Sequence, residues 1–317
     1  MPHRSPRKRA VLLAGSAVVA ALALSGLSTT GALYTDSKSV GSNTFTTRAA
    51  CAAGTGYPTA VKALGPTFYY RFGEAAGATT VADSSGNGNT GTVRTSSPNT
   101  GVAPALTFGA AGSGLIWCDT TGLTSPKIVG TLNSGSFVVW PSARANLNTF
   151  SIMAWVRTST TTGGRIIGQS SSTWAKDVHY DRQLIFTDTG HVAFDMYPGF
   201  NYAMTSTAAL NDGLPHFLVA TLGPAGATLY VDGVLDQSDP TRTTAETYTT
   251  NENVNPPPAG APRTPDGQGY WRVGWDNLAS WGATDFGLNG VIDEAALFEN
   301  QQLNAGQVAG LWAKNHW

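Results

Sequence analysis

The stretch FSIMAWVR, residues 150–157, alternates apolar and polar side chains and predicts a β-strand with a buried face. Other strand-like runs surround it, at residues 67–72, 165–168, 183–186, 191–196, 216–222, 228–231, 270–273 and 290–298. Turn formers separate several of them, at 188–190, 223–226 and 232–233. No helical pattern alternates with these runs, which disfavours a parallel α/β fold. Their regular spacing predicts an all-β antiparallel sandwich.

Two short helices are expected at the ends of this β region. Residues 58–64 begin with proline and are followed by Gly65, as at the start and end of a short helix. Asn304 and Gln307 have the spacing of a capping box before a helix that runs to about Lys314. The Thr-, Asn- and Pro-rich stretch 239–269 interrupts the strand pattern and predicts a long surface loop.

Composition supports this class of fold. Charged residues make up 12% of the 317 residues and 37 are glycine, which suits short strands joined by tight turns. Without residues 1–32, the chain has 15 basic and 20 acidic side chains. A mildly acidic body with no Lys/Arg stripe argues against nucleic-acid binding.

The N-terminus has the order of a secretory signal peptide. Four basic residues are followed by an apolar run from Ala10 to about Leu27 and then by small residues. The alternative is a permanent membrane anchor, but the run is rich in Ala, Gly and Ser and only weakly apolar. We therefore expect residues 1–32 to be removed and residues 33–56 to form a linker, with membrane contact only through an uncleaved signal segment.

The junction after Ala32 has a particular sequence. ALYTDS at 32–37 and GSNTFTT at 41–47 resemble the junction that SipW-type signal peptidases process in Gram-positive secreted proteins. The resemblance implies a protein secreted from, or displayed on, a Gram-positive cell. Cys51 and Cys118 would then share an oxidising compartment, which favours a disulfide between them over a metal or redox role.

The β region resembles a known family. YYRFGE at 69–74, DSSGNGN at 83–89, FSIMAWVR at 150–157, NDGLPH at 211–216, LYVDG at 229–233 and GVIDEA at 290–295 occur in family order. They resemble the laminin-G-like, concanavalin A-like lectin/glucanase domains of bacterial surface proteins. The resemblance implies a two-sheet jelly roll over residues 57–317, with its first and last strands side by side. Pro215 departs from the pattern, because the family has an aromatic residue before His216, which we expect to be a packed structural histidine.

The same resemblance implies a structural calcium ion. Asp83 and Asn87 lie in a loop with oxygen ligands of the kind that calcium prefers, and Asp293 occupies the place of an aspartate that closes such a site in related jelly rolls. The alternative is that Asp83 makes only an Asx turn and that Asp293 caps a bulge.

Catalytic motifs are missing from the sequence. Retaining glycosidases need two carboxylates about 5 Å apart, and the family-16 glucanases supply them from a Glu-x-Asp-x-Glu run. None of the five glutamates, at 74, 246, 252, 294 and 299, forms that run. No Gly-x-Ser-x-Gly or HExxH motif occurs. We therefore expect no enzyme, with a divergent glycoside hydrolase as an alternative.

Aromatic side chains with polar neighbours are the candidates for ligand binding. Trp174 and Tyr180 precede a predicted hairpin, and Trp275 and Trp281 follow the long loop. The alternatives are that Trp275 packs inward with Trp271, and that Asp181 and Arg182 form a pair that fixes the hairpin. Trp155, on an alternating strand, is expected in the core.

These observations favour a secreted or cell-surface, non-catalytic binding module for an extracellular glycan or protein. A second hypothesis is a structural component of a matrix or envelope whose sandwich self-associates.

Overall fold

The computed structural model describes most of the β region. The described residues are 56–95, 106, 108, 115, 123–125, 135–173, 180–197, 200–245, 267–279 and 281–314. All of them belong to one compact unit, Gly54–Trp317. The signal segment, the linker and both cysteines lie outside the described residues. No helix among the described residues has the length and apolar character that crossing a bilayer requires.

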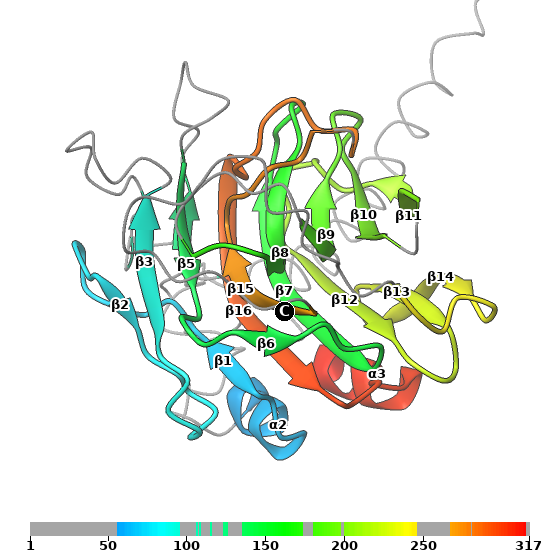
Figure 1. Cartoon of the computed structure of the whole chain (residues 1–317), viewed down its shortest axis with the longest axis horizontal. Coiled ribbons are helices and arrows are strands. Elements are labelled where there is room, and N and C mark those ends of the chain that lie inside the picture. Colours follow the sequence, from blue (N-terminus) through cyan, green and yellow to red (C-terminus); the bar gives the residue numbers. More distant parts are fainter. Residues whose placement is uncertain are drawn as a thin grey trace, which may run out of the picture. The chain divides into compact units, whose positions relative to one another are not determined.

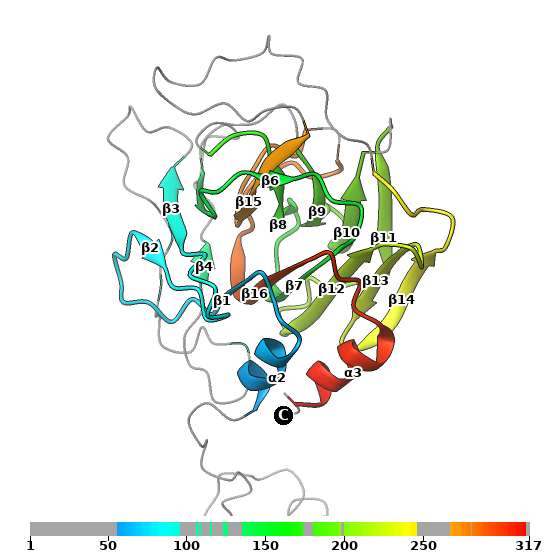
Figure 2. The ribbon, with the colours of Figure 1, turned by 60° about the horizontal axis from the view of Figure 1, so that its bottom comes forward.

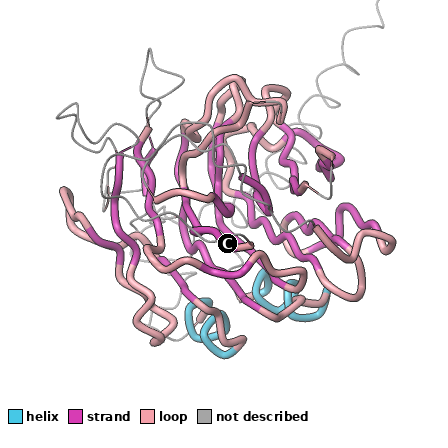
Figure 3. Tube along the Cα trace, in the orientation of Figure 1, coloured by secondary structure: helices cyan, strands magenta, loops and turns pink. Residues whose placement is uncertain are grey.

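Two antiparallel sheets form the fold (Figures 1 and 3). The seven-stranded sheet has the order β1 (Phe68–Tyr70), β16 (Gly290–Glu299), β7 (Phe150–Thr158), β12 (His216–Leu222), β13 (Ala227–Val231) and β14 (Val234–Asp239), with β4 (Leu123–Ser125) also paired to β16. The nine-stranded sheet has the order β11 (Tyr202–Ala209), β10 (His191–Met196), β9 (Tyr180–Phe186), β8 (Gly164–Ser170), β15 (Gln268–Val273), β5 (Ser136–Val139), β3 (Gly91–Thr95) and β2 (Thr80–Val81), with β6 (Arg144–Ala145) paired to β15. The predicted antiparallel sandwich is therefore confirmed, and β1 lies beside β16 as the resemblance implied.

The main core lies between the two sheets. Alternate side chains of β7 and β12, such as Ile152 and Leu218, are buried in one hydrophobic cluster with Leu184, Phe194 and Trp271 of the other sheet. Because successive side chains of a strand point to opposite faces, this cluster fixes which residues reach the outer face of each sheet, meaning the face turned away from the other sheet.

Helices cover the outer face of the seven-stranded sheet. Helices α2 (Tyr57–Ala63) and α3 (Ala305–Ala313) lie next to each other at one end of the unit (Figure 2). Tyr57 packs edge-on against Trp155, and Trp312 stacks on Trp155 at a centroid distance of 5.3 Å. Trp155 is thus fully buried, under the helices rather than between the sheets. The predicted capping box of Asn304 and Gln307 is confirmed.

A chain segment, not a helix, covers part of the outer face of the nine-stranded sheet. We call residues 274–279 and 281–288 the strap. Its apolar side chains pack on the outward residues of β5, β9 and β10 in a separate cluster that includes Phe137, Ile185 and Ala193. Two hydrogen-bonded contacts fasten it: Thr284 N–H and hydroxyl donate to the Asp188 carboxylate, and Thr162 pairs with Asp285.

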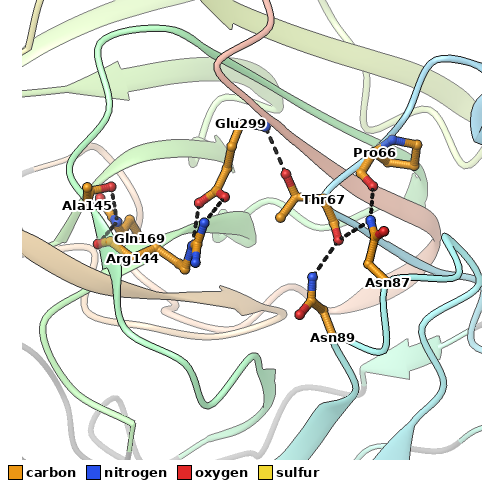
Figure 4. Close-up of polar contacts among 8 residues, drawn as sticks. All are labelled: Pro66, Thr67, Asn87, Asn89, Arg144, Ala145, Gln169 and Glu299. Carbon is orange, nitrogen blue, oxygen red and sulfur yellow. Dashed lines mark hydrogen bonds and ion pairs between the residues drawn. The ribbon is translucent and has the colours of Figure 1, made fainter.

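An ion pair ties the two sheets together (Figure 4). Both oxygens of Glu299, at the end of β16, accept hydrogen bonds from Arg144 on β6, with Nε to Oε1 at 2.8 Å. The Arg144 guanidinium also lies 4.9 Å from the ring centroid of Trp140. Because β6 pairs with β15 of the nine-stranded sheet, this contact links the end of β16 to the opposite layer.

Candidate functional site

Asp83 holds its own loop in place. Its carboxylate accepts hydrogen bonds from the backbone N–H groups of Tyr69, Ser85 and Asn89, each at 2.9 Å, and from the Ser85 hydroxyl at 2.7 Å. The bond from Ser85 N–H is that of an Asx turn. Asn87 donates its amide N–H to the carbonyls of Pro66 and Thr67 (Figure 4).

Asp293 lies in a different, acidic environment. It is fully buried opposite Trp155, and it accepts the N–H groups of Leu115 and Glu294 at 2.9 Å each. Glu294 sits at the β-bulge with φ 52°, and one of its oxygens pairs with Arg71 at 3.0 Å. Burial raises the pKa of Glu294 well above its usual range.

The predicted calcium ligands do not make up a fitting donor set. Asp83 is surrounded by N–H and O–H donors, and Asn87 presents its amide N–H to carbonyls. Among the described residues, no group of three or more His, Cys, Asp or Glu side chains is placed to hold a metal ion. The contacts match the Asx-turn alternative for Asp83, and calcium binding stays a prediction.

Two of the four predicted ligand aromatics are buried. Trp275 is 3% exposed and stacks on Phe137 at a centroid distance of 5.7 Å, and Trp281 is 8% exposed. Both belong to the strap and pack on the nine-stranded sheet. Trp174 and the side chain of Tyr180 lie outside the described residues. Asp181 and Arg182 do form a buried pair at 2.6 Å, and Arg182 also donates to the carbonyls of Leu147 and Ala245.

Charged side chains lie buried beside the strap on the same sheet face. Asp276 of the strap pairs with Arg165 of β8 at 3.0 Å and with Arg272 of β15 at 3.2 Å, and it accepts the Ser170 hydroxyl. The three charged side chains are fully buried. Arg272 also lies 4.4 Å from the ring centroid of Phe137. This network joins the strap to the sheet through ion pairs as well as through apolar contacts.

The neighbouring pair Gln183 and Asp195 has no such partners. The two residues lie opposite each other on β9 and β10. They are two residues along each strand from the pair Ile185 and Ala193, which the strap covers. Both are fully buried, and by distance and angle neither side chain makes a hydrogen bond to another described residue, although the Gln183 amide is close enough to Asp195 to lower the pKa of its carboxyl. A buried polar group that lacks a hydrogen bond costs about 1–3 kcal/mol, so this pair is costly to bury unless a hydrogen-bonding group reaches it.

The surroundings of Asp195 raise the pKa of its carboxyl group. Burial raises its pKa well above the usual range, and the nearby charge of Asp181 raises it further. The Gln183 amide and the positive charge of Arg165 offset only part of this rise. Gly168 leaves room for Arg165 and Gln183 to lie close together, because a Cβ at this position would collide with both of them. The pair would gain from any ligand that satisfies its polar atoms.

An exposed aromatic ring lies next along the strand. Tyr197 directly follows the last residue of β10, two positions beyond Asp195. Tyr197 is 38% exposed, whereas Asp195 is fully buried. We call Gln183, Asp195 and Tyr197 the β9–β10 site. Its residues run from an enclosed polar pair to a ring that solvent reaches.

The sequence carried one signal for this site, and it was missed. In His191–Met196, residues 192, 194 and 196 are apolar and face the core, which places Asp195 on the other face. That an outward carboxylate would be buried depends on how distant parts of the chain pack, which alternation alone does not reveal.

The glutamates that the structure describes are engaged in contacts of their own. Of the glutamates that the structure describes, Glu294 pairs with Arg71, Glu299 pairs with Arg144, and Glu74 accepts the N–H of Ala82. Asp195 is paired across the strands with the Gln183 amide, and the Asp181 carboxylate lies near enough to raise the pKa of Asp195.

Comparisons with known proteins give the family and a set of similar folds. Residues 132–309 match the family model Laminin_G_3, described as the concanavalin A-like lectin/glucanases superfamily. No curated protein matches the sequence.

Solved structures with a similar fold share little sequence with this chain. Trypanosoma rangeli sialidase in complex with sialic acid is 15% identical with a TM-score of 0.47, over 78% of this chain and 32% of the sialidase. Domain 4 of AbnA, a GH43 extracellular arabinanase from Geobacillus stearothermophilus in complex with arabinotriose, is 18% identical with a TM-score of 0.43, over 78% of this chain and 97% of that domain. The chain thus spans about a third of the length of the sialidase.

Proposed function

Because the chain belongs to the concanavalin A-like lectin/glucanase superfamily, we propose that it is a non-catalytic module that binds a glycan at the β9–β10 site. One observation carries this proposal: Gln183 and Asp195 are buried polar side chains that make no hydrogen bond to other described residues, and the partly exposed Tyr197 follows two positions beyond Asp195. A sugar hydroxyl both donates and accepts hydrogen bonds, so hydroxyl groups can satisfy the carboxylate and the amide together. The Tyr197 ring offers an apolar face for the same sugar.

Other ligand classes fit this site less well. A metal ion could bind the Asp195 oxygens but could not satisfy the amide N–H groups of Gln183, and the charge of Arg165 lies nearby. An anion would meet the Asp195 carboxylate. A neutral, hydroxyl-rich molecule satisfies all four atoms whether Asp195 is ionised or protonated.

The signal-peptide pattern of residues 1–32 supports binding outside the cell. We propose that the protein is secreted or displayed on the surface of a Gram-positive bacterium, with an extracellular glycan as its partner. Binding without turnover is consistent with the pairing of the described glutamates.

A glycan array followed by calorimetry of the hits tests the proposal. We expect Asp195→Asn and Gln183→Leu each to weaken binding by up to about tenfold, because a hydrogen bond contributes about 0.5–1.5 kcal/mol. Asp236→Asn is the matched control, since Asp236 lies on β14 of the other sheet. A blank array, or equal binding by all three variants and the parent, would overturn the proposal.

Self-association is a second candidate, favoured by a separate surface. Leu214, Val234 and Leu235 are exposed apolar side chains, and the last two lie on β14 at the edge of its sheet. Exposed edges and apolar side chains promote pairing between chains. Sedimentation across a wide concentration range tests this, and a monomer at every concentration would exclude it.

Structural calcium stays a prediction of the family resemblance, against which the protein contacts of Asp83 and Asn87 count. Thermal unfolding with added calcium and with a chelator checks it. A rise in Tm with calcium that is lost in Asp293→Ala would support the site, and identical melting curves would remove it.

A further inference from the structure

The chain contains the dipeptide Asn-Gly twice, at Asn87-Gly88 and at Asn289-Gly290. Asn-Gly is the pair at which a polypeptide most readily modifies itself, because the backbone nitrogen after the asparagine can attack its side-chain amide and glycine has no side chain to hinder that approach. The two copies share this chemistry and lie in different surroundings. The molecule therefore carries its own matched comparison.

The first copy lies in an open loop. Asn87 and Gly88 are both exposed, and Gly88 has a φ of 75° with no heavy atom from another part of the chain within 4 Å of where a Cβ would stand. The N–H groups on either side are bonded, that of Asn87 to Ser85 Oγ and that of Asn89 to the Asp83 carboxylate. Among the described residues, the Gly88 N–H has no acceptor. The attacking nitrogen is thus available, and the backbone around it has room to turn.

The second copy lies at the start of a central strand. Gly290 begins β16 and is paired on both sides, with Thr158 of β7 and with Ser125 of β4. A residue paired on both sides of an antiparallel sheet has its N–H within one of the two ladders. The Asn289 carbonyl also accepts the Thr158 hydroxyl at 2.6 Å. This nitrogen cannot turn toward the asparagine side chain unless the strands separate.

The side chain of Asn87 fastens its loop to the start of the domain. Its amide nitrogen donates to the Pro66 carbonyl at 2.9 Å and to the Thr67 carbonyl at 3.2 Å, between α2 and β1 (Figure 4). Because water competes for the hydrogen bonds of an exposed side chain, these bonds slow the loss of the nitrogen without preventing it.

We propose that Asn87 is a site of spontaneous deamidation, from which the sheet protects Asn289. The Gly88 nitrogen gives its proton to hydroxide and forms a bond to the Asn87 side-chain amide carbon, and the side-chain nitrogen leaves as ammonia. Water then opens the cyclic imide at either of its two carbonyl carbons, which gives aspartate or isoaspartate and restores the Gly88 N–H. The net change replaces an amide by a carboxylate, with one water consumed and one ammonia released.

This change unfastens the loop. The new carboxylate has no proton to donate and faces the carbonyl oxygens of Pro66 and Thr67, and it adds a negative charge to a loop that already holds Asp83. The bond from the Asn89 amide to the Thr67 carbonyl, at 2.7 Å, is then the side-chain contact that still joins the loop to this segment. The protein thus acquires, with time, a charge and a looser loop beside its first strand.

Peptide mapping of the full chain by mass spectrometry tests the inference. The folded protein is incubated in mildly alkaline water enriched in heavy oxygen, so that each newly formed carboxylate carries a label and any aspartate present beforehand does not. We expect label at residue 87 to accumulate about tenfold faster than at residue 289, because the second reaction waits for the strands to open. In guanidinium chloride, where both copies are unfolded, the two rates should converge.

Variants supply the controls. Asn87→Gln should carry no label at this position, because its longer side chain would have to close a larger ring, which forms far more slowly. Asn87→Asp reproduces one product and should melt at a lower temperature than the parent protein, whereas Asn289→Asp should not. An unchanged Tm in Asn87→Asp would overturn the loosening of the loop.

Three labelling results would overturn the modification site itself. Equal rates at the two positions in the folded protein would show that the sheet gives no protection. Faster labelling of residue 289 would reverse the assignment. Label at residue 87 in guanidinium chloride but none in the folded protein would show that the bonds to Pro66 and Thr67 protect the amide completely.

Discussion

The two outer faces of the sandwich are covered in different ways. Two helices cover the seven-stranded sheet, and their contact with it centres on Trp155, Tyr57 and Trp312. The nine-stranded sheet is covered in part by the strap, which is joined to it by the Asp276 ion pairs as well as by apolar side chains. Both faces hold buried polar atoms without partners among the described residues.

The difference lies in what is next to those atoms. Under the helices, the buried Tyr57 hydroxyl lies near Trp155 and near the carboxylates of Glu294 and Asp293. Beside the strap, the pair Gln183 and Asp195 lies close in sequence to Tyr197, whose side chain is partly exposed. A buried polar group therefore indicates a binding site only where solvent-exposed residues lie near it. This molecule contains buried polar groups with and without such neighbours.

Breaking the strap network is expected to have the largest effect. Asp276→Leu leaves Arg165 and Arg272 buried without their shared carboxylate, and we expect a loss of about 3–5 kcal/mol in the free energy of unfolding measured in urea. Asp188→Ala removes the exposed fastening of the strap at Thr284 and should cost less than about 1 kcal/mol. If the two variants lose equal stability, the ion pairs do not hold the strap.

The helix-covered face should affect stability without affecting binding. Trp312→Ala removes the ring stacked on Trp155, and we expect a loss of about 2 kcal/mol because Trp312 is only partly buried. Urea unfolding measures this loss, and calorimetry with the glycan should give an unchanged affinity. Weaker binding in a folded Trp312→Ala protein would show that the two faces are coupled.

Asp195→Asn should show the opposite behaviour, with weaker binding but no loss of stability. The pKa of the buried carboxyl is raised, so the folded state binds more protons than the unfolded state above pH 4. The parent protein then loses stability as the pH rises from about 4 through the folded pKa, and the variant does not. At neutral pH, we expect the variant to be about 1 kcal/mol more stable. Urea unfolding at pH 4 and pH 7.5 checks this, and a parallel pH dependence in both proteins would contradict it.

The smallest effect is expected at His216, outside both covered faces. Its Nδ1 lies 2.9 Å from Asp232 and its Nε2 lies 3.2 Å from Asp212. Burial alone would lower its pKa, but the hydrogen bonds and charges of the two aspartates outweigh burial and raise the pKa. The resulting stability is fully present below the unfolded pKa of about 6.5 and is lost as the pH rises through the folded pKa.

The aspartates are partly exposed, so solvent screening limits this contribution to about 0.5 kcal/mol. His216→Gln should lose that amount at pH 5.5 and nothing at pH 9, as measured by urea unfolding. A difference between the parent and this variant that is the same at both pH values would contradict the assignment.

Local sequence predicted the elements better than it predicted the site. The strand at 150–157, the hairpin about Gly190 and the capping box at Asn304 each depend on a few neighbouring residues, and the structure confirms them. The edge strands β11 and β14 were missed, because their side chains are largely exposed and show little apolar alternation.

The site depends on contacts between distant parts of the chain. Trp275 has the polar neighbours of a binding residue, and only the return of the strap onto β5 buries it against Phe137. Asp195 and Gln183 are far less conspicuous in the sequence, yet strand pairing brings them together. Trp174 and Tyr180 remain predictions, as does the disulfide between Cys51 and Cys118, since these side chains lie outside the described residues.

The pairing of β1 with β16 also has a mechanical consequence. The strands are antiparallel, with Phe68 opposite Leu297, so the chain enters β1 at the end of the ladder where it leaves β16. A pulling force on both ends of the unit would therefore part this ladder one hydrogen bond at a time, instead of shearing all of its bonds together. The domain is weak along that axis despite its large core, which suits a module held by one end better than a link in a chain under tension.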